Sequence, residues 1–246
     1  MTMAHSTSPH AGAPLTIQAV APLAQRTLVM RSTALDADRW IDPIFSADGE
    51  NRSPPLSWTA VLEAESFALV VEDPDAPGDE PFIHWLIWDI PGTATALPRG
   101  IEAAAHPGEP AGAVQGRNGR GGYGWFGPRP PLGHGVHRYH FQLFALGKRL
   151  GMGPETGPKE LVNAVKGSVI ACGELVGLFE NRDPVADAPS PGRTGSYGAE
   201  PSNVQATAHE AEAGRGGLDA DDPDRHAPHD PDGEVRRRGG DQPNLL

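Results

Sequence analysis

The chain has 246 residues, a length that suits one domain with tails or two small domains. Acidic residues number 32 against 20 Lys and Arg, so the formal charge is −12 and the sequence lacks the basic face that nucleic-acid binding requires. The single cysteine, Cys172, excludes an internal disulfide framework and a zinc site built from several cysteines. Any bound anion must therefore be held by locally placed donors.

The two ends of the chain differ in composition from its middle. Residues 1–24 are expected to be a flexible segment, with Leu15–Ile17 as a candidate edge strand. The segment lacks the basic start and the apolar run of a signal peptide. Residues 183–246 lack Phe, Trp, Ile and Met and carry 13 acidic against 6 basic residues, which predicts a disordered acidic tail. No stretch approaches the roughly 20 apolar residues of a membrane span. These features favour a cytoplasmic protein without a transmembrane segment.

Residues 25–182 contain every Trp and Phe of the chain and are expected to form one compact domain. Runs of β-branched and aromatic residues predict four strands, at 27–32, 66–72, 82–90 and 136–146. The last run alternates, so that Tyr139 and Phe141 share one face while Arg138 and His140 share the other. Loops rich in Pro and Gly separate the runs, which is typical of an antiparallel sandwich.

One helix is expected near the end of this domain. Residues 157–160 form a plausible helix start, and apolar residues then recur at spacings of three and four as far as Phe179. Gly167 and Gly173 weaken this pattern, so one helix and two shorter helices both remain open. The fold class that follows is mostly β, an antiparallel two-sheet sandwich with a short C-terminal helical element.

Two polar segments adjoin the predicted strands at 66–72 and 82–90. The prolines of Asp73-Pro74-Asp75-Ala76-Pro77 stiffen the loop after the first of these strands. Such a loop either aims a carboxylate into a site or forms a turn with solvated carboxylates, which is the commoner case. His84 lies within the second strand among large apolar neighbours. It is either a core histidine bonded to backbone or a donor at the mouth of a pocket.

The third polar segment is the most informative. A Gly- and Pro-rich loop at 127–135 runs directly into a strand that begins with His137-Arg138-Tyr139. Glycine lets the backbone approach a ligand closely, and imidazole and phenol groups can form hydrogen bonds with phosphoryl oxygens. Because strand side chains alternate, His137 and His140 fall on opposite faces, which argues against a zinc site made from these histidines.

Other chemistries have little support in the sequence. There is no Gly-x-Ser-x-Gly elbow and no Gly-rich phosphate loop followed by a helix. Cys172 falls within the apolar helical pattern, where a small core residue is expected rather than a reactive thiol. The Gly- and Ala-rich stretch at 101–124 is expected to be a loop that covers the pocket.

In this order, these segments resemble the phosphatidylethanolamine-binding protein family, in particular its bacterial Raf-kinase-inhibitor-like branch. The resemblance covers about residues 27 to 182 and leaves both tails unexplained. The matching pieces are Asp48-Gly49-Glu50-Asn51, Ser53-Pro54-Pro55-Leu56-Ser57-Trp58, Asp73-Pro74-Asp75-Ala76-Pro77, His84-Trp85, Gly127-Pro128 with Pro130-Pro131, His137-Arg138-Tyr139 and Gly173-Glu174-Leu175-Val176-Gly177.

The resemblance implies a two-sheet sandwich with a pocket at one end of the sheets for phosphate-bearing head groups or small oxyanions. Asp73 is then expected to orient an imidazole, and His84 and Tyr139 to donate to anion oxygens. Arg138 is expected on the other face. This chain has Arg129 where the branch often has Cys. The arginine is expected to add positive charge at the rim of the pocket. The residues implied to line the pocket are Asp73, Asp75, His84, Gly127, Pro128, His137 and Tyr139.

The expected function is that of a non-enzymatic protein that binds a phosphorylated small molecule or a phospholipid head group, without metal or cofactor. An alternative is a protein regulator that inhibits a kinase or protease through its surface or its acidic tail. A hydrolase that uses the His and Asp side chains ranks last, because no activated nucleophile or full metal-ligand set is evident.

Overall fold

The computed structural model describes residues 14–182, so the predictions for residues 1–13 and for the acidic tail at 183–246 lie outside the described residues. Within this range the chain forms two α-helices, two short 3₁₀ helices at 21–23 and 43–45, and nine strands. The α-helices and strands are α1 (Thr16–Val20), β1 (Arg26–Thr27), β2 (Met30–Arg31), β3 (Leu56–Trp58), β4 (Ser66–Asp73), β5 (Phe82–Pro91), β6 (Ala96–Leu97), β7 (Val114–Gln115), β8 (His137–Leu146), α2 (Pro158–Lys166) and β9 (Val169–Phe179).

The strands form two sheets. The larger has the order β1-β9-β8-β4-β5-β7 and the smaller has the order β2-β3-β6. Neighbouring strands run antiparallel, except that β1 runs parallel to β9. Side chains from both sheets, such as Leu69 and Phe141 of the larger and Trp58 of the smaller, share one buried apolar core. The predicted two-sheet, mostly β fold is therefore confirmed.

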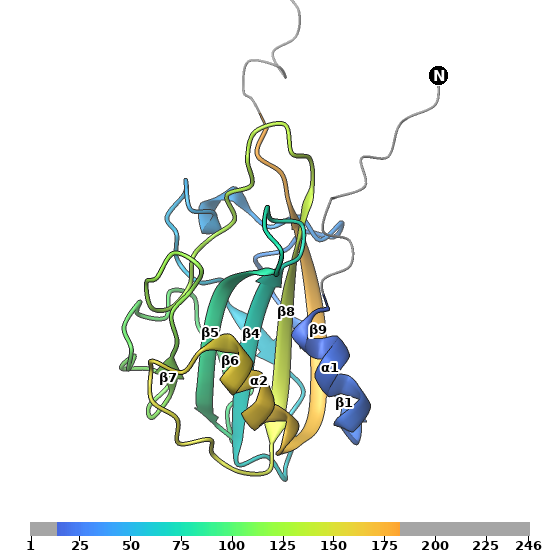
Figure 1. Ribbon diagram of the computed structural model, residues 1–246, viewed down its shortest axis with the longest axis vertical. Coiled ribbons are helices and arrows are strands. Elements are labelled where there is room, and N and C mark those ends of the chain that lie inside the picture. Colours follow the sequence, from blue (N-terminus) through green and yellow to red (C-terminus); the bar gives the residue numbers. More distant parts are fainter. Residues whose placement is uncertain (1–13, 183–246) are drawn as a thin grey trace, which may run out of the picture. The chain divides into compact units, whose positions relative to one another are not determined.

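The two α-helices lie against the other face of the larger sheet (Figure 1). Val70, Leu86 and Phe144 of that face pack in a second apolar cluster with Leu161 and Val165 of α2. Apolar layers on both faces explain why the central strands β4 and β5 have nearly continuous apolar sequences rather than a strict alternation. Within residues 14–182 no helix is long and apolar enough to cross a bilayer.

Helix α1 differs from the sequence expectation of a flexible segment with a candidate edge strand. The backbone N–H and the hydroxyl of Thr16 donate to the Glu72 carboxylate at 2.9 and 2.7 Å, and the backbone N–H of Ile17 donates to the side-chain oxygen of Gln142. The start of a helix leaves N–H groups unpaired, and here side chains of the sheet bind them. The local sequence supplies one further cap, because the side chain of Gln18 accepts the N–H of Leu15 at 3.2 Å, but the N-cap residue Leu15 has no side-chain acceptor of its own.

The second difference concerns the C-terminal end of the domain. Helix α2 ends at Lys166, and the apolar residues at 169–179 form strand β9 instead of continuing the helix. This strand pairs with β8 along its whole length, from Val169 opposite Leu146 to Phe179 opposite His137. A Cβ atom at Gly173 would lie 2.3 Å from the Leu28 carbonyl oxygen, so the glycine permits close packing of β9. Long-range pairing therefore outweighs the helical spacing.

The topology gathers the predicted polar segments at one end of the larger sheet. Asp73 at the end of β4 lies opposite Phe82 at the start of β5, and Glu72 lies opposite His140 of β8. The loop after β4 and the long loop before β8 consequently extend from the same end (Figure 1).

Candidate functional site

A β-bulge in β5 turns His84 toward Asp73. Val71 of β4 pairs with Trp85, but the next residue, Glu72, pairs with Ile83, so His84 is the extra residue. A bulge of this kind re-aims side chains. Ile83 packs in the helix-facing cluster, whereas Trp85 packs between the sheets and the His84 ring lies 4.9 Å from the ring of Tyr139. The bulge thus brings the strand histidine to the sandwich side.

Asp73 is the centre of a buried polar cluster. Its Oδ2 atom lies 2.7 Å from Nδ1 of His137 and 4.0 Å from Nε2 of His84, and its Oδ1 atom accepts the backbone N–H of Asp75 at 2.8 Å. Asp73, His84 and His137 are all 3% exposed or less. Asp73 therefore orients the imidazole of His137, while the His84 ring is close but not hydrogen-bonded to it.

The protonation state of His84 follows from the environment of its other ring nitrogen, Nδ1. Nδ1 lies 2.6 Å from the Phe126 carbonyl oxygen, which can only accept, so Nδ1 carries the proton. Burial lowers the pKa of His84 to about 4, and the positive charges of His137 and Arg120 act in the same direction, against the Phe126 carbonyl and Asp73. At neutral pH the imidazole is uncharged and its Nε2 atom is an acceptor. This differs from the donor role that the sequence suggested.

The hydroxyl of Tyr139 is fully buried and has no hydrogen-bond partner among residues 14–182. Burial, helped by the carboxylates of Asp73 and Asp75, raises the pKa of the Tyr139 phenol, although the nearby backbone N–H of Arg129 opposes this shift. The phenol is therefore protonated and can donate. A buried polar group without a partner costs about 1–3 kcal/mol, so this hydroxyl is available to a hydrogen-bond acceptor.

Asp75 has a different role from its neighbour Asp73. It accepts the backbone N–H of Arg138 at 2.9 Å and two guanidinium N–H groups at 2.8 and 2.7 Å. Although burial raises it, these bonds hold the pKa of the Asp75 carboxyl below its ordinary value. Its acceptor atoms are thus used to fasten the loop after β4 to the start of β8, so Asp75 positions Asp73 rather than offering a free carboxylate.

The predicted glycine and proline of the long loop are also engaged within the protein. The N–H of Gly127 donates to Asn51 at 2.8 Å, and the Pro128 carbonyl accepts the N–H of Ala47 at 3.0 Å. A Cβ atom on Gly127 would lie 2.3 Å from the Phe45 carbonyl oxygen, which explains the need for glycine there. These two residues hold the loop against the segment at 45–51, beside Phe126 whose carbonyl binds His84.

His134, which was not among the expected site residues, extends the cluster to the surface. Its Nδ1 atom lies 3.0 Å from Nε2 of His137, so an exposed imidazole, a buried imidazole and the Asp73 carboxylate form one hydrogen-bonded chain. His140, by contrast, lies on the opposite face of β8 and pairs with Glu174 at 2.8 Å. The alternation predicted for this strand is confirmed.

Arg120 is a second residue that the sequence did not reveal. Its guanidinium carbon lies 5.3 Å from the centre of the Phe126 ring, and that ring stacks with His84 at 6.0 Å. Arg129 pairs with Asp48 at 3.1 Å, and Arg138 is bound to Asp75. Within the described residues, the Arg120 guanidinium forms no ion pair, which leaves it as the free positive charge beside His84. Its place in a Gly-rich stretch gives no sequence signal.

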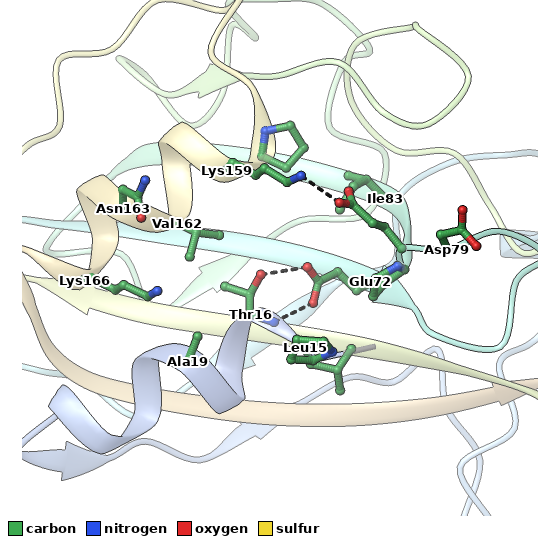
Figure 2. A pocket seen from close by; sticks show the side chains of 14 residues that line it. Leu15, Thr16, Ala19, Glu72, Asp79, Ile83, Lys159, Val162, Asn163 and Lys166 are labelled. Atoms are coloured by element: carbon green, nitrogen blue, oxygen red, sulfur yellow. Dashed lines mark hydrogen bonds and ion pairs between the residues drawn. The ribbon is translucent and has the colours of Figure 1, made fainter. Parts of the chain in front are cut away.

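A cavity of about 870 Å³ lies elsewhere, between α1, α2 and the helix-facing side of β4 and β5. Figure 2 shows Thr16 and Glu72 in the middle of this cavity, with Lys166 and Asp79 toward opposite ends. None of the expected site residues lines it. Its buried carboxylate, Glu72, is already bound by Thr16 and Gln142, whereas the cluster around Asp73 includes the unpaired Tyr139 hydroxyl. The Asp73 cluster is therefore the candidate site.

The candidate site consists of Asp, His and Tyr side chains. It contains no Ser, Thr or Cys, and within residues 14–182 no group of three His, Cys, Asp or Glu side chains is arranged to hold a metal ion. Cys172 lies in the helix-facing cluster, and burial raises the pKa of its thiol. Two packed sheets with a buried polar cluster at one end define a small β-sandwich domain.

Comparison with known proteins assigns the family. The phosphatidylethanolamine-binding protein family model matches residues 31–180, so the chain belongs to this family. In general terms, it is a family of ligand-binding and regulatory proteins. A UPF0098 protein of Pyrococcus horikoshii is 40% identical over 152 residues, which are 61% of this chain and 76% of that protein.

Two solved structures are similar to the described domain. YbcL of Escherichia coli, described as a member of the mammalian phosphatidylethanolamine-binding protein family, is 28% identical with a TM-score of 0.57, covering 64% of this chain and 99% of that one. A family homologue from Chlamydia trachomatis is 33% identical with a TM-score of 0.56, covering 63% and 99%.

Proposed function

We propose that this chain is a non-enzymatic binding protein whose site around Asp73 holds a phosphate-like anion, either a free small molecule or a phosphorylated head group. The observation that carries the proposal is the buried Tyr139 hydroxyl, which lacks a partner next to Asp73 and His84. An anion oxygen that accepts this hydroxyl would satisfy it. Arg120 supplies a positive charge beside the same site.

The charge balance of the site supports a small anion held by few groups. Arg129 and Arg138 are paired with Asp48 and Asp75, and His84 is uncharged at neutral pH, so in the described part of the chain Arg120 remains as an unpaired positive charge near the site. A cluster without Ser, Thr or Cys supports binding over nucleophilic catalysis by an aliphatic hydroxyl or a thiol. A regulator that acts through the acidic tail would use residues that lie outside the described ones.

The test is a titration of the full chain with inorganic phosphate, phosphoethanolamine and ethanolamine, followed through the imidazole resonances of His84 and His137. Saturable shifts with the two phosphorylated compounds alone are expected. His84→Ala and Tyr139→Phe should weaken binding about tenfold, the loss expected for one hydrogen bond to a charged group. His106→Ala, at an exposed loop position, is the matched control. Absence of any saturable shift would disprove the proposed function.

A further inference from the structure

The polar atoms around the candidate site are not all donors. Oδ2 of Asp73 is a carboxylate oxygen, and Nε2 of the neutral His84 carries a lone pair, so two acceptors lie 4.0 Å apart. No hydrogen-bond donor of the described residues binds Nε2 of His84. The Tyr139 hydroxyl, in contrast, is a buried donor with no partner. A complementary ligand must therefore accept one hydrogen bond and donate another.

This arrangement of two acceptors and one donor distinguishes tetrahedral anions that carry a proton from those that do not. Sulfate and a phosphodiester carry only acceptor oxygens at neutral pH, so each would place negative oxygens against the Asp73 carboxylate and the His84 lone pair. Inorganic phosphate and a phosphate monoester retain an ionisable proton, with a second pKa of about 6 for a monoester. The P–OH group can donate to Asp73 or His84 while another oxygen accepts from Tyr139.

We propose that this site selects a phosphate group that carries a proton, as inorganic phosphate or a phosphate monoester, over sulfate and over phosphodiester head groups. The proposal rests on the proposed function, because it specifies the ligand of the same site. The geometry that carries it is the pair of facing acceptors together with the unpartnered phenol.

The pH dependence of ligand binding also depends on the other charged groups that face the site. His137 shares the Asp73 carboxylate and is itself bonded to His134, whose imidazole is exposed. The other charged groups at this end of the sheet are the Asp75–Arg138 and Asp48–Arg129 ion pairs and the guanidinium of Arg120.

The experiment is isothermal titration of the full chain, at constant ionic strength, with inorganic phosphate, phosphoethanolamine, sulfate and dimethyl phosphate. At pH 6 we expect the first two to bind at least about tenfold more tightly than the last two, since one charged hydrogen bond is worth about this factor. Between pH 7 and pH 8 the affinity for phosphoethanolamine should fall about tenfold, because the protonated fraction of a ligand with a pKa of about 6 falls by that factor.

The possible outcomes separate this proposal from the proposed function. If sulfate or dimethyl phosphate binds as tightly as phosphate, or if the affinity for phosphoethanolamine is flat from pH 6 to pH 8, the selection is refuted and anion binding stands. If none of the four compounds binds at any pH, both proposals fail. This ligand series uses the unmodified chain and does not depend on the folding of a variant.

A variant provides a second test. Asp73→Asn replaces an acceptor by an amide that can donate, so sulfate should gain affinity while phosphate loses it, and the ratio between them should approach one. Asp79→Asn changes the same type of side chain at an exposed position of the loop before β5 and should leave the ratio unchanged. An Asp73→Asn protein that folds and keeps the original ratio would contradict the proposal.

Discussion

The imidazole of His137, rather than that of His84, is the hydrogen-bond partner of Asp73: its Nδ1 atom lies 2.7 Å from Oδ2, whereas Nε2 of His84 lies 4.0 Å away. The two histidines therefore divide their roles. His137 offsets a buried carboxylate within the protein, and His84 presents an unpaired nitrogen toward the candidate site. The two should respond differently to substitution.

His137→Ala is expected to lower the free energy of unfolding by about 1–3 kcal/mol, because it leaves the Asp73 carboxylate buried without its imidazole partner. His134→Ala removes the exposed member of the same chain and should change stability by less than about 0.5 kcal/mol. Urea unfolding of both variants measures the difference. Equal midpoints for His137→Ala and the unmodified chain would show that the Asp73–His137 bond does not stabilise the fold.

The buried, neutral His84 should make the protein less stable as the pH falls. Its pKa is lowered from 6.5 to about 4 by burial, so between these values the unfolded chain binds a proton that the folded chain does not. The free energy of unfolding therefore decreases as the pH drops through this window, by about 3 kcal/mol at most. His84→Gln, which keeps a donor for the Phe126 carbonyl, should flatten the stability profile between pH 6.5 and pH 4. An unchanged slope in urea unfolding across that range would contradict the lowered pKa.

Part of the candidate site follows from the sequence and part depends on long-range pairing. The alternation of β8 correctly places Tyr139 and His137 on one face and His140 on the other. The direction of His84 could not be predicted, because the bulge that turns it depends on the register between β4 and β5. The interaction of Arg120 with Phe126 depends on how a Gly-rich loop folds, and glycine restricts the backbone too little to indicate this.

The two ends of the domain also depend on long-range contacts that the local sequence does not indicate. The spacing of apolar residues correctly gives helix α2, but the same spacing continues into β9, where pairing with β8 decides the structure. Helix α1 has only five residues, too few to be stable alone, and it is held by Glu72 and Gln142 from the sheet. Residues 14–24 by themselves do not indicate these partners, which lie more than fifty residues further along the chain.

The capping of α1 by the sheet can be tested through Glu72. Glu72→Ala removes the acceptor of both Thr16 bonds, so α1 should lose protection from hydrogen exchange and stability should fall by about 1–3 kcal/mol. The control is Glu80→Ala, because Glu80 forms an exposed pair with Lys159 at 2.7 Å, and a solvent-exposed ion pair contributes little to stability. If α1 exchanges equally in both variants, the helix is held by its apolar contacts and not by the Glu72 carboxylate.

The free guanidinium of Arg120 predicts a salt-dependent contribution to anion binding. Arg120→Ala should weaken the binding of inorganic phosphate by about two- to fivefold at low ionic strength, the range for one exposed charge pair, and the difference should shrink in high salt. Arg120→Lys keeps the charge but loses the planar contact with Phe126, so an intermediate affinity is expected.

Arg31→Ala makes the same change in net charge on β2 of the smaller sheet and serves as the matched control. Titration calorimetry at two salt concentrations measures all four proteins. Equal losses in Arg120→Ala and Arg31→Ala would mean that only the overall charge matters, and that Arg120 has no particular place in the site.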